Sequence, residues 1–138
     1  MNWIAKIRPQ IFLAICILGA IAIYADCEIT YIVDGDTCDV KIDLGFDVFY
    51  KTRVRLMGIN APESRTRDKE EKYRGLQAKS RFTELVREKN VRLISHEKGK
   101  YGRVLGEILI ERGSEWVNVN KQLVQEGHAV EYFGGKRK

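Results

Sequence analysis

The feature that most constrains the fold is a strict alternation of apolar and polar residues in the first half of the chain. Over residues 37–44, apolar side chains take every second position, the pattern of a β-strand with one face against a core. Residues 28–33 read as another strand, and Asp34-Gly35-Asp36 between the two predicts a hairpin turn in which Gly35 can adopt a positive φ. A third strand is predicted over residues 48–59, so the chain is expected to begin as a sheet with one buried face.

The second half of the chain mixes helices and strands. A charge-dense stretch without apolar periodicity predicts an exposed, mobile loop over residues 64–72. The last helix is expected to begin after Asn118 as its N-cap and to end at Gly127. The other predicted elements are a helix over residues 74–88 and strands over residues 91–95 and 103–111. Five strands with a helix inserted after the third indicate the α+β class and a five-stranded OB-fold-type β-barrel with two helices.

The first 25 residues differ in character from the rest. Lys6 and Arg8 precede an uncharged apolar run over residues 11–25, which is the layout of a secretory signal. We expect this hydrophobic leader to be a signal peptide cleaved after Ala25, or an uncleaved anchor that tethers the protein to the membrane. The protein is accordingly expected to be secreted or periplasmic, or membrane-anchored. The expected divisions are a leader (1–25), one domain (26–133) and a basic disordered tail (134–138).

Charge and cysteine content narrow the function classes only slightly. The formal net charge of +5 suits a polyanionic partner without proving one. No Cys or His spacing is typical of a zinc site, and His96 and His128 lack the motif of a histidine nuclease. A turn at Gly35 would set Cys38 opposite a residue near Ile32, so free or buried thiols are favoured over a bridge between Cys38 and Cys27.

Three short motifs carry residues suited to phosphodiester hydrolysis. They are Asp34-Gly35-Asp36-Thr37, the segment from Arg55 to Glu63 (RLMGINAPE), and Lys100-Tyr101-Gly102-Arg103. Carboxylate and amide oxygens can hold a hard cation, and guanidinium groups bind phosphate through two parallel hydrogen bonds. A glutamate can take a proton from water. Together these groups predict a metal-assisted phosphodiesterase.

The order and spacing of the three motifs resemble the thermonuclease family, the staphylococcal-nuclease-like domains, from about Cys27 to about Phe133. The resemblance implies an OB-type barrel and a calcium-dependent endonuclease that leaves 3′-phosphate ends on DNA or RNA, with single strands preferred. It implies Asp36, Asn60 and the Ala61 carbonyl as calcium ligands, with Asp34 assisting. It implies Glu63 as general base or water-positioning residue, Arg55 and Arg103 as phosphate-binding catalytic residues, and Lys100 and Tyr101 as contacts to a terminal phosphate.

One position departs from the family pattern. Each candidate residue, taken singly, also has a purely structural explanation. Asn60 stands where the family most often has Asp, which removes one negative charge from the metal site and should weaken calcium binding. Taken singly, Asp36 and Asn60 can be turn residues, and Glu63 and the arginines can be ordinary surface residues. Phe133 can be a stacking face for a base or part of the core. The alternative function is a non-catalytic OB-type nucleic-acid-binding module.

Overall fold

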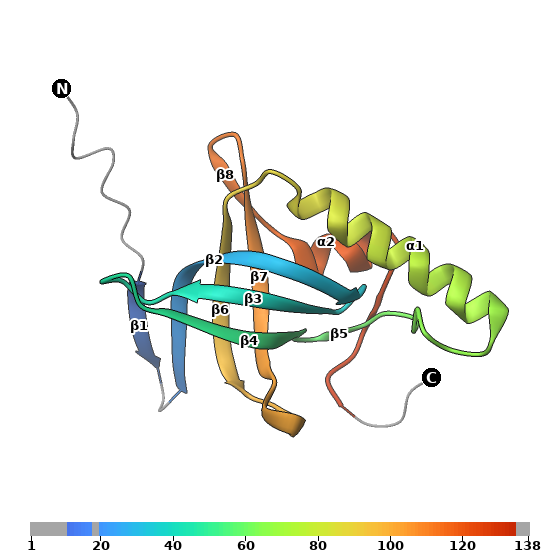
Figure 1. Cartoon of the computed structure of the whole chain (residues 1–138), viewed down its shortest axis with the longest axis horizontal. Helices are drawn as coiled ribbons and strands as arrows, with labels where there is room; N and C mark the ends of the chain where they lie inside the picture. The colour runs from blue at the N-terminus through green and yellow to red at the C-terminus, as the bar shows by residue number, and fades with distance from the viewer. Residues whose placement is uncertain (1–10, 18–19, 135–138) are drawn as a thin grey trace.

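The structure, a computed structural model, describes residues 11–17 and 20–134 of the 138-residue chain. Five strands close into a barrel in the order β2, β3, β4, β7 and β6, because β2 also pairs with β6 (Figure 1). Their bounds are β2 Ala20–Asp34, β3 Thr37–Asp43, β4 Phe49–Leu56, β6 Val91–Lys98 and β7 Val104–Arg112. All barrel pairs are antiparallel except β4 with β7. The predicted OB-type barrel is therefore confirmed.

The remaining elements surround this barrel. Helix α1 (Lys69–Val86) follows the third barrel strand, as predicted, and lies with α2 (Val119–Gln125) at one end of the barrel (Figure 1). Strand β1 (Ile11–Ile17) pairs with β2, and β8 (Glu115–Asn118) pairs with β7. Two short strands, β5 (Ile59–Asn60) and β9 (Val130–Glu131), form a ribbon of their own. The 3-10 turn η2 (Lys100–Gly102) precedes β7.

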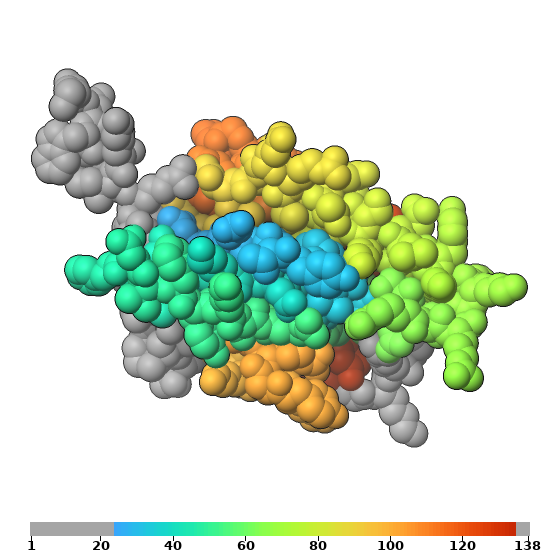
Figure 2. Space-filling view, viewed as in Figure 1, coloured from blue at the N-terminus to red at the C-terminus, as the bar shows by residue number. Residues whose placement is uncertain are grey.

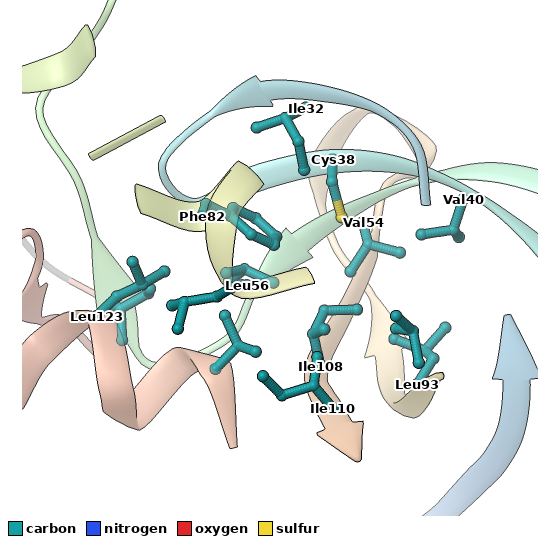
Figure 3. Packing of buried hydrophobic residues seen from close by; sticks show 14 of the residues in the cluster. Ile32, Cys38, Val40, Val54, Leu56, Phe82, Leu93, Ile108, Ile110 and Leu123 are labelled. Carbon is teal, nitrogen blue, oxygen red and sulfur yellow. The ribbon is translucent and has the colours of Figure 1, made fainter. Parts of the chain in front are cut away.

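Alternating residues of the barrel strands fill its interior, as the period-two pattern predicts. Cys38 and Val40 on β3 and Val54 and Leu56 on β4 are almost completely buried (Figure 3). Ile108 and Ile110 of β7 face them, while Phe82 of α1 and Leu123 of α2 close the end of the barrel (Figure 3). Because the even-numbered residues of β4 point inward, the odd-numbered ones lie on the outside of the barrel.

Several predicted boundaries differ from the structure. The predicted loop over residues 64–72 is wrong from Lys69 onward, because the Asp68 side chain accepts hydrogen bonds from the Glu70 and Glu71 amides and caps α1 there. The third strand ends at Leu56 rather than at residue 59, since Gly58 takes a φ of 79° and turns the chain. The N-cap Asp68 and the turn residue Gly58 are both visible in the sequence. The start of α1 was nevertheless missed, because its exposed first turn shows no apolar periodicity.

The start of the barrel also lies earlier than predicted. Strand β2 begins at Ala20 instead of residue 28, since the backbone from Ile23 to Cys27 pairs with β6. The expected cleavage point after Ala25 therefore falls within a strand. Residues 11–17 of the expected leader form β1, while residues 1–10 and 18–19 lie outside the described residues, as does the tail beyond Gly134. In the described part of the chain, no helix is long and apolar enough to cross a membrane.

Cys27 and Cys38 are free thiols, as favoured from the sequence. Cys38 lies opposite Ile32, while Cys27 lies opposite Ile42, several residues along the hairpin. Burial raises the pKa of the Cys27 thiol to about 12, and it raises that of Cys38 as well. Neither thiol is therefore an ionised nucleophile at neutral pH.

Candidate active site

Two loops at the same end of the β3–β4 ribbon meet at the candidate site. The turn between β2 and β3 carries Asp34 and Asp36, and the segment after β5 carries Ala61, Glu63 and Ser64. Asp36 accepts a hydrogen bond from the Ala61 amide at 2.8 Å, and Asp34 accepts hydrogen bonds from both the amide and the hydroxyl of Ser64. The two acidic residues thus fix both ends of the segment that contains Glu63.

Gly35 permits this close approach, although not for the predicted reason. Its φ is not among the positive values, so the expectation of a left-handed turn residue at this position is wrong. A Cβ at Gly35 would lie 2.6 Å from the Ala78 Cβ and 3.0 Å from the Ala61 Cβ. The turn needs glycine because α1 and the Ala61 segment both press against its backbone.

Asp36 is the most constrained acid of the site. It is 5% exposed, and its Oδ1 accepts the Thr37 hydroxyl at 2.8 Å. Its Oδ2 takes the Ala61 amide and lies 3.3 Å from Nη2 of Arg55. A carboxylate held by this many donors keeps a fixed orientation.

Arg55 closes the site from β4, where register sets it opposite Thr37. Its Nη1 donates to the Leu56 carbonyl at 2.9 Å, and its Nη2 donates to Asn60 Oδ1 at 3.2 Å. The side chain is only 14% exposed. These bonds hold the guanidinium against the Asp36 carboxylate.

The oxygen donors predicted as metal ligands converge in the structure. Asp36 Oδ2 and Asn60 Oδ1 lie 3.3 Å and 3.2 Å from the same Arg55 nitrogen, so one positive group already lies between them. A carboxylate, an amide oxygen and the nearby Ala61 backbone offer the oxygen donors that a hard cation such as calcium prefers. The described residues contain no group of three or more His, Cys, Asp or Glu side chains that would make a more highly charged site.

Glu63 lies on the exposed side of the same segment. Its amide donates to Glu71 Oε1 at 3.4 Å, at the start of α1. Gly75 of α1 lies against its carbonyl, since a Cβ there would lie 2.4 Å from the Glu63 oxygen. The backbone of Glu63 is therefore fixed, while its side chain is at the surface, where it can reach water and substrate.

Arg103, Lys100 and Tyr101 lie on a neighbouring segment rather than in the Asp36–Arg55 cluster. Arg103 is half-buried and its Nε donates to the Lys100 carbonyl at 3.3 Å, while the Tyr101 ring is 92% exposed. Parallel pairing of Val104 with Val54 brings this segment beside β4. The segment and the acidic turn line one open hollow, bordered by Asp34, Thr37, Asp39, Arg53, Arg65, Tyr101 and Arg103.

The structure adds residues that the sequence reasoning did not assign. Thr37 orients Asp36, Ser64 binds Asp34, and Arg65 lines the hollow beside Arg103. Thr37 belongs to the Asp34–Thr37 motif and could have been found from the sequence. The contact of Ser64 with Asp34 joins residues 30 positions apart, so no local sequence pattern predicts it. Phe133 is 83% exposed with its ring against Gly58, so the core reading for it is wrong.

Comparison with known proteins agrees with this geometry. The family model described as a staphylococcal nuclease homologue matches residues 53–138, which include Arg55, Asn60, Glu63 and Arg103. Protein ParB of Escherichia coli is 31% identical over 140 residues, covering 96% of this chain and 72% of that protein. The micrococcal nuclease of Shigella flexneri is 31% identical over 126 residues, covering 86% of this chain and 66% of that protein.

A further relative contains the domain as a small part of a longer chain. Endonuclease YhcR of Bacillus subtilis is 34% identical over 110 residues, which cover 74% of this chain but 8% of that protein. The match extends across the barrel, and the residues of the first two motifs lie together where the two loops meet. The chain belongs to the staphylococcal nuclease family.

Proposed function

We propose that this chain, a nuclease by family membership, is a calcium-dependent endonuclease that hydrolyses phosphodiester bonds in DNA and RNA and leaves 3′-phosphate ends. The observation that carries the proposal is the placement of Asp36 Oδ2 and Asn60 Oδ1 around one guanidinium nitrogen. This arrangement brings two metal-binding oxygens and a phosphate-binding group to one point. Relatives named as nucleases support the reaction class.

The residues of the site have distinct tasks in this mechanism. Bound calcium would supply positive charge beside the phosphate, held by Asp36, Asn60 and the Ala61 carbonyl. Arg55 binds a phosphate oxygen through its guanidinium, and its bonds to the Leu56 carbonyl and to Asn60 keep it from turning away. Glu63 takes a proton from the attacking water. The new P–O bond forms as the bond to the 5′ oxygen breaks, and that oxygen takes a proton to become a 5′-hydroxyl.

The segment before β7 binds the flanking part of the substrate. Arg103 contacts a further phosphate oxygen, and Lys100 and Tyr101 bind the neighbouring phosphate. Single strands are preferred, because the backbone must bend into the hollow and the exposed ring of Phe133 can stack on a base.

A direct test uses the full chain with labelled single-stranded DNA, in calcium, in manganese or in chelator. Cleavage that requires calcium and disappears in Glu63→Gln is expected, with ends that block a polymerase until a phosphatase removes the 3′-phosphate. Glu115→Gln is the matched control, since Glu115 is an exposed glutamate on β8. Binding without cleavage in either metal would contradict the proposal and favour the non-catalytic binding module.

Export is the second part of the proposal and rests on the sequence of residues 1–25. Lys6 and Arg8 before an uncharged apolar run are the support for secretion or a periplasmic location, with membrane anchoring as the uncleaved form. Fractionation of cells that make the full chain, with mass determination of the product, tests it. A full-length product in the cytoplasmic fraction would contradict both forms.

A further inference from the structure

The outer face of the β3–β4 ribbon continues away from the candidate active site. Because Val54 and Leu56 point into the core, Arg55, Arg53 and Lys51 share the outer face of β4. Alternate residues of a strand lie about 6.7 Å apart on one face, so the three cations form a row that begins at the site. Figure 2 shows that strands β2 to β4, in blue to green, lie open across the front of the molecule.

The far end of this row contains an unfavourable pair. Lys41 of β3 and Lys51 of β4 are directly opposite each other in the antiparallel register. Like charges at such positions destabilise a sheet. Among residues 11–17 and 20–134, no carboxylate lies within salt-bridge distance of either lysine, although Glu28 is opposite Lys41 on β2. An anion bound over the pair would relieve this repulsion.

The middle of the row is neutral but still able to bind phosphate. Arg53 donates to both oxygens of Asp39, from Nε at 2.7 Å and from Nη2 at 3.0 Å. This pair lowers the pKa of Asp39 and raises that of Arg53, so both groups stay charged. The guanidinium has five N–H donors, of which two bind Asp39, and its side chain is 48% exposed.

Both ends of the row join features suited to a nucleic acid. At the far end, the half-exposed Phe49 ring lies under Lys41, whose Nζ is 4.2 Å from the ring centroid. An aromatic face beside a cation is the arrangement on which unpaired bases stack. At the near end the row begins with Arg55, and the next residue of the row, Arg53, lines the same hollow as Arg65 and Arg103. The row is therefore continuous with the candidate active site.

We propose that Arg53, Lys51, Lys41 and Phe49 form a track that binds a single-stranded polynucleotide several nucleotides away from the bond that is cut. The inference rests on the proposed function and extends it, since it makes the preferred substrate a chain long enough to cross the ribbon. The corresponding face of OB-fold barrels, on the second and third strands, is a surface on which such folds bind oligonucleotides. The phosphates lie over the cations and a base stacks on Phe49.

The test compares two double variants of the full chain with equal loss of charge. Lys41→Gln with Lys51→Gln removes the end of the track, and Lys89→Gln with Lys121→Gln removes two exposed lysines near the ends of the helices. For a 20-nucleotide single strand, the track variant should raise KM roughly tenfold with kcat unchanged. Its binding should also depend less on salt, by about 1.4 in the slope of log K against log salt, since two phosphate contacts are lost.

Substrate length separates the track from the site itself. A dinucleotide has a single phosphodiester bond, which must occupy the site to be cut, so its kinetics should be equal in the track variant, the control variant and the unaltered chain. The track would be overturned if the two double variants raised KM for the 20-nucleotide strand equally. It would also be overturned if the track variant raised KM for the dinucleotide as much as for the 20-nucleotide strand.

The track is also testable if the chain fails to cut. Fluorescence anisotropy of the labelled 20-nucleotide strand in chelator then measures the Kd directly. Weaker binding by the track variant alone would support the track while the proposed hydrolysis fails. Equal Kd values for both double variants would refute the track, whatever the activity.

Discussion

Replacing Asn60 by aspartate should restore the second carboxylate of the metal site and tighten calcium binding. Asn60 Oδ1 and Asp36 Oδ2 lie 3.2 Å and 3.3 Å from the same Arg55 nitrogen, so they are at most 6.5 Å apart. A cation that binds both oxygens would take the place of that nitrogen, with each oxygen about 2.4 Å away. Asn60→Asp therefore adds a negative charge to a position that already faces the proposed metal, with no change in side-chain size.

The size of the effect follows from Coulomb's law. A carboxylate oxygen about 2.4 Å from a divalent cation gains about 3.5 kcal/mol at the dielectric constant of water. Before the metal binds, the new carboxylate would pair with Arg55 at the distance of the present hydrogen bond, and giving up that pairing costs about 1.3 kcal/mol. The difference of about 2 kcal/mol corresponds to roughly thirtyfold tighter calcium binding.

Calorimetric titration of calcium into the metal-free chain measures this change, and the calcium midpoint of cleavage gives a second readout. Gln125→Glu is the charge-matched control, since Gln125 is exposed near the end of α2. An unchanged Kd in Asn60→Asp, or an equal gain in the control, would show that Asn60 is not a metal ligand. The convergence of oxygens around Arg55 would then serve only to hold the arginine.

Three further predictions concern stability and the support of the site. Thr37→Val removes the hydroxyl bonded to the buried Asp36 carboxylate and should cost about 2 kcal/mol in denaturant unfolding, whereas an unchanged midpoint would refute that bond. Gly75→Ala forces the Glu63 carbonyl to move and should cost about 1–3 kcal/mol and lower kcat; full activity would mean that the helix does not position Glu63. Because burial raises the pKa of Cys27 to about 12, its thiol ionises first in the unfolded chain. The Cys27 thiol should therefore lower the free energy of unfolding from about pH 8.5 upward by at most about 1.4 kcal/mol per pH unit, in addition to the contribution of Cys38, and Cys27→Ala should remove the Cys27 part of this slope.

Local patterns in the sequence predicted the barrel strands well. The alternation over residues 37–44 appears in the structure as β3, with Cys38 and Val40 buried, because side-chain period alone decides which face of a strand meets the core. Asn118 and Gly127 likewise mark the ends of α2, since caps depend only on nearby backbone groups. The start of α1 was missed because its first turn is exposed and polar on all sides. The start of β2 was missed because pairing with β6 extends it.

The three motifs identified the acidic residues, the arginines and Asn60 as candidate site residues, because metal binding, phosphate binding and proton transfer each need a particular type of side chain in any fold. The sequence by itself thus determined the family, the barrel and the residues available for catalysis. Only the tertiary structure decided that Asp36 and Asn60 share one nitrogen of Arg55, that Arg103 lies apart across the hollow, and that Lys41 faces Lys51. These relations join strands far apart in the chain, so they depend on register and barrel closure rather than on any local pattern.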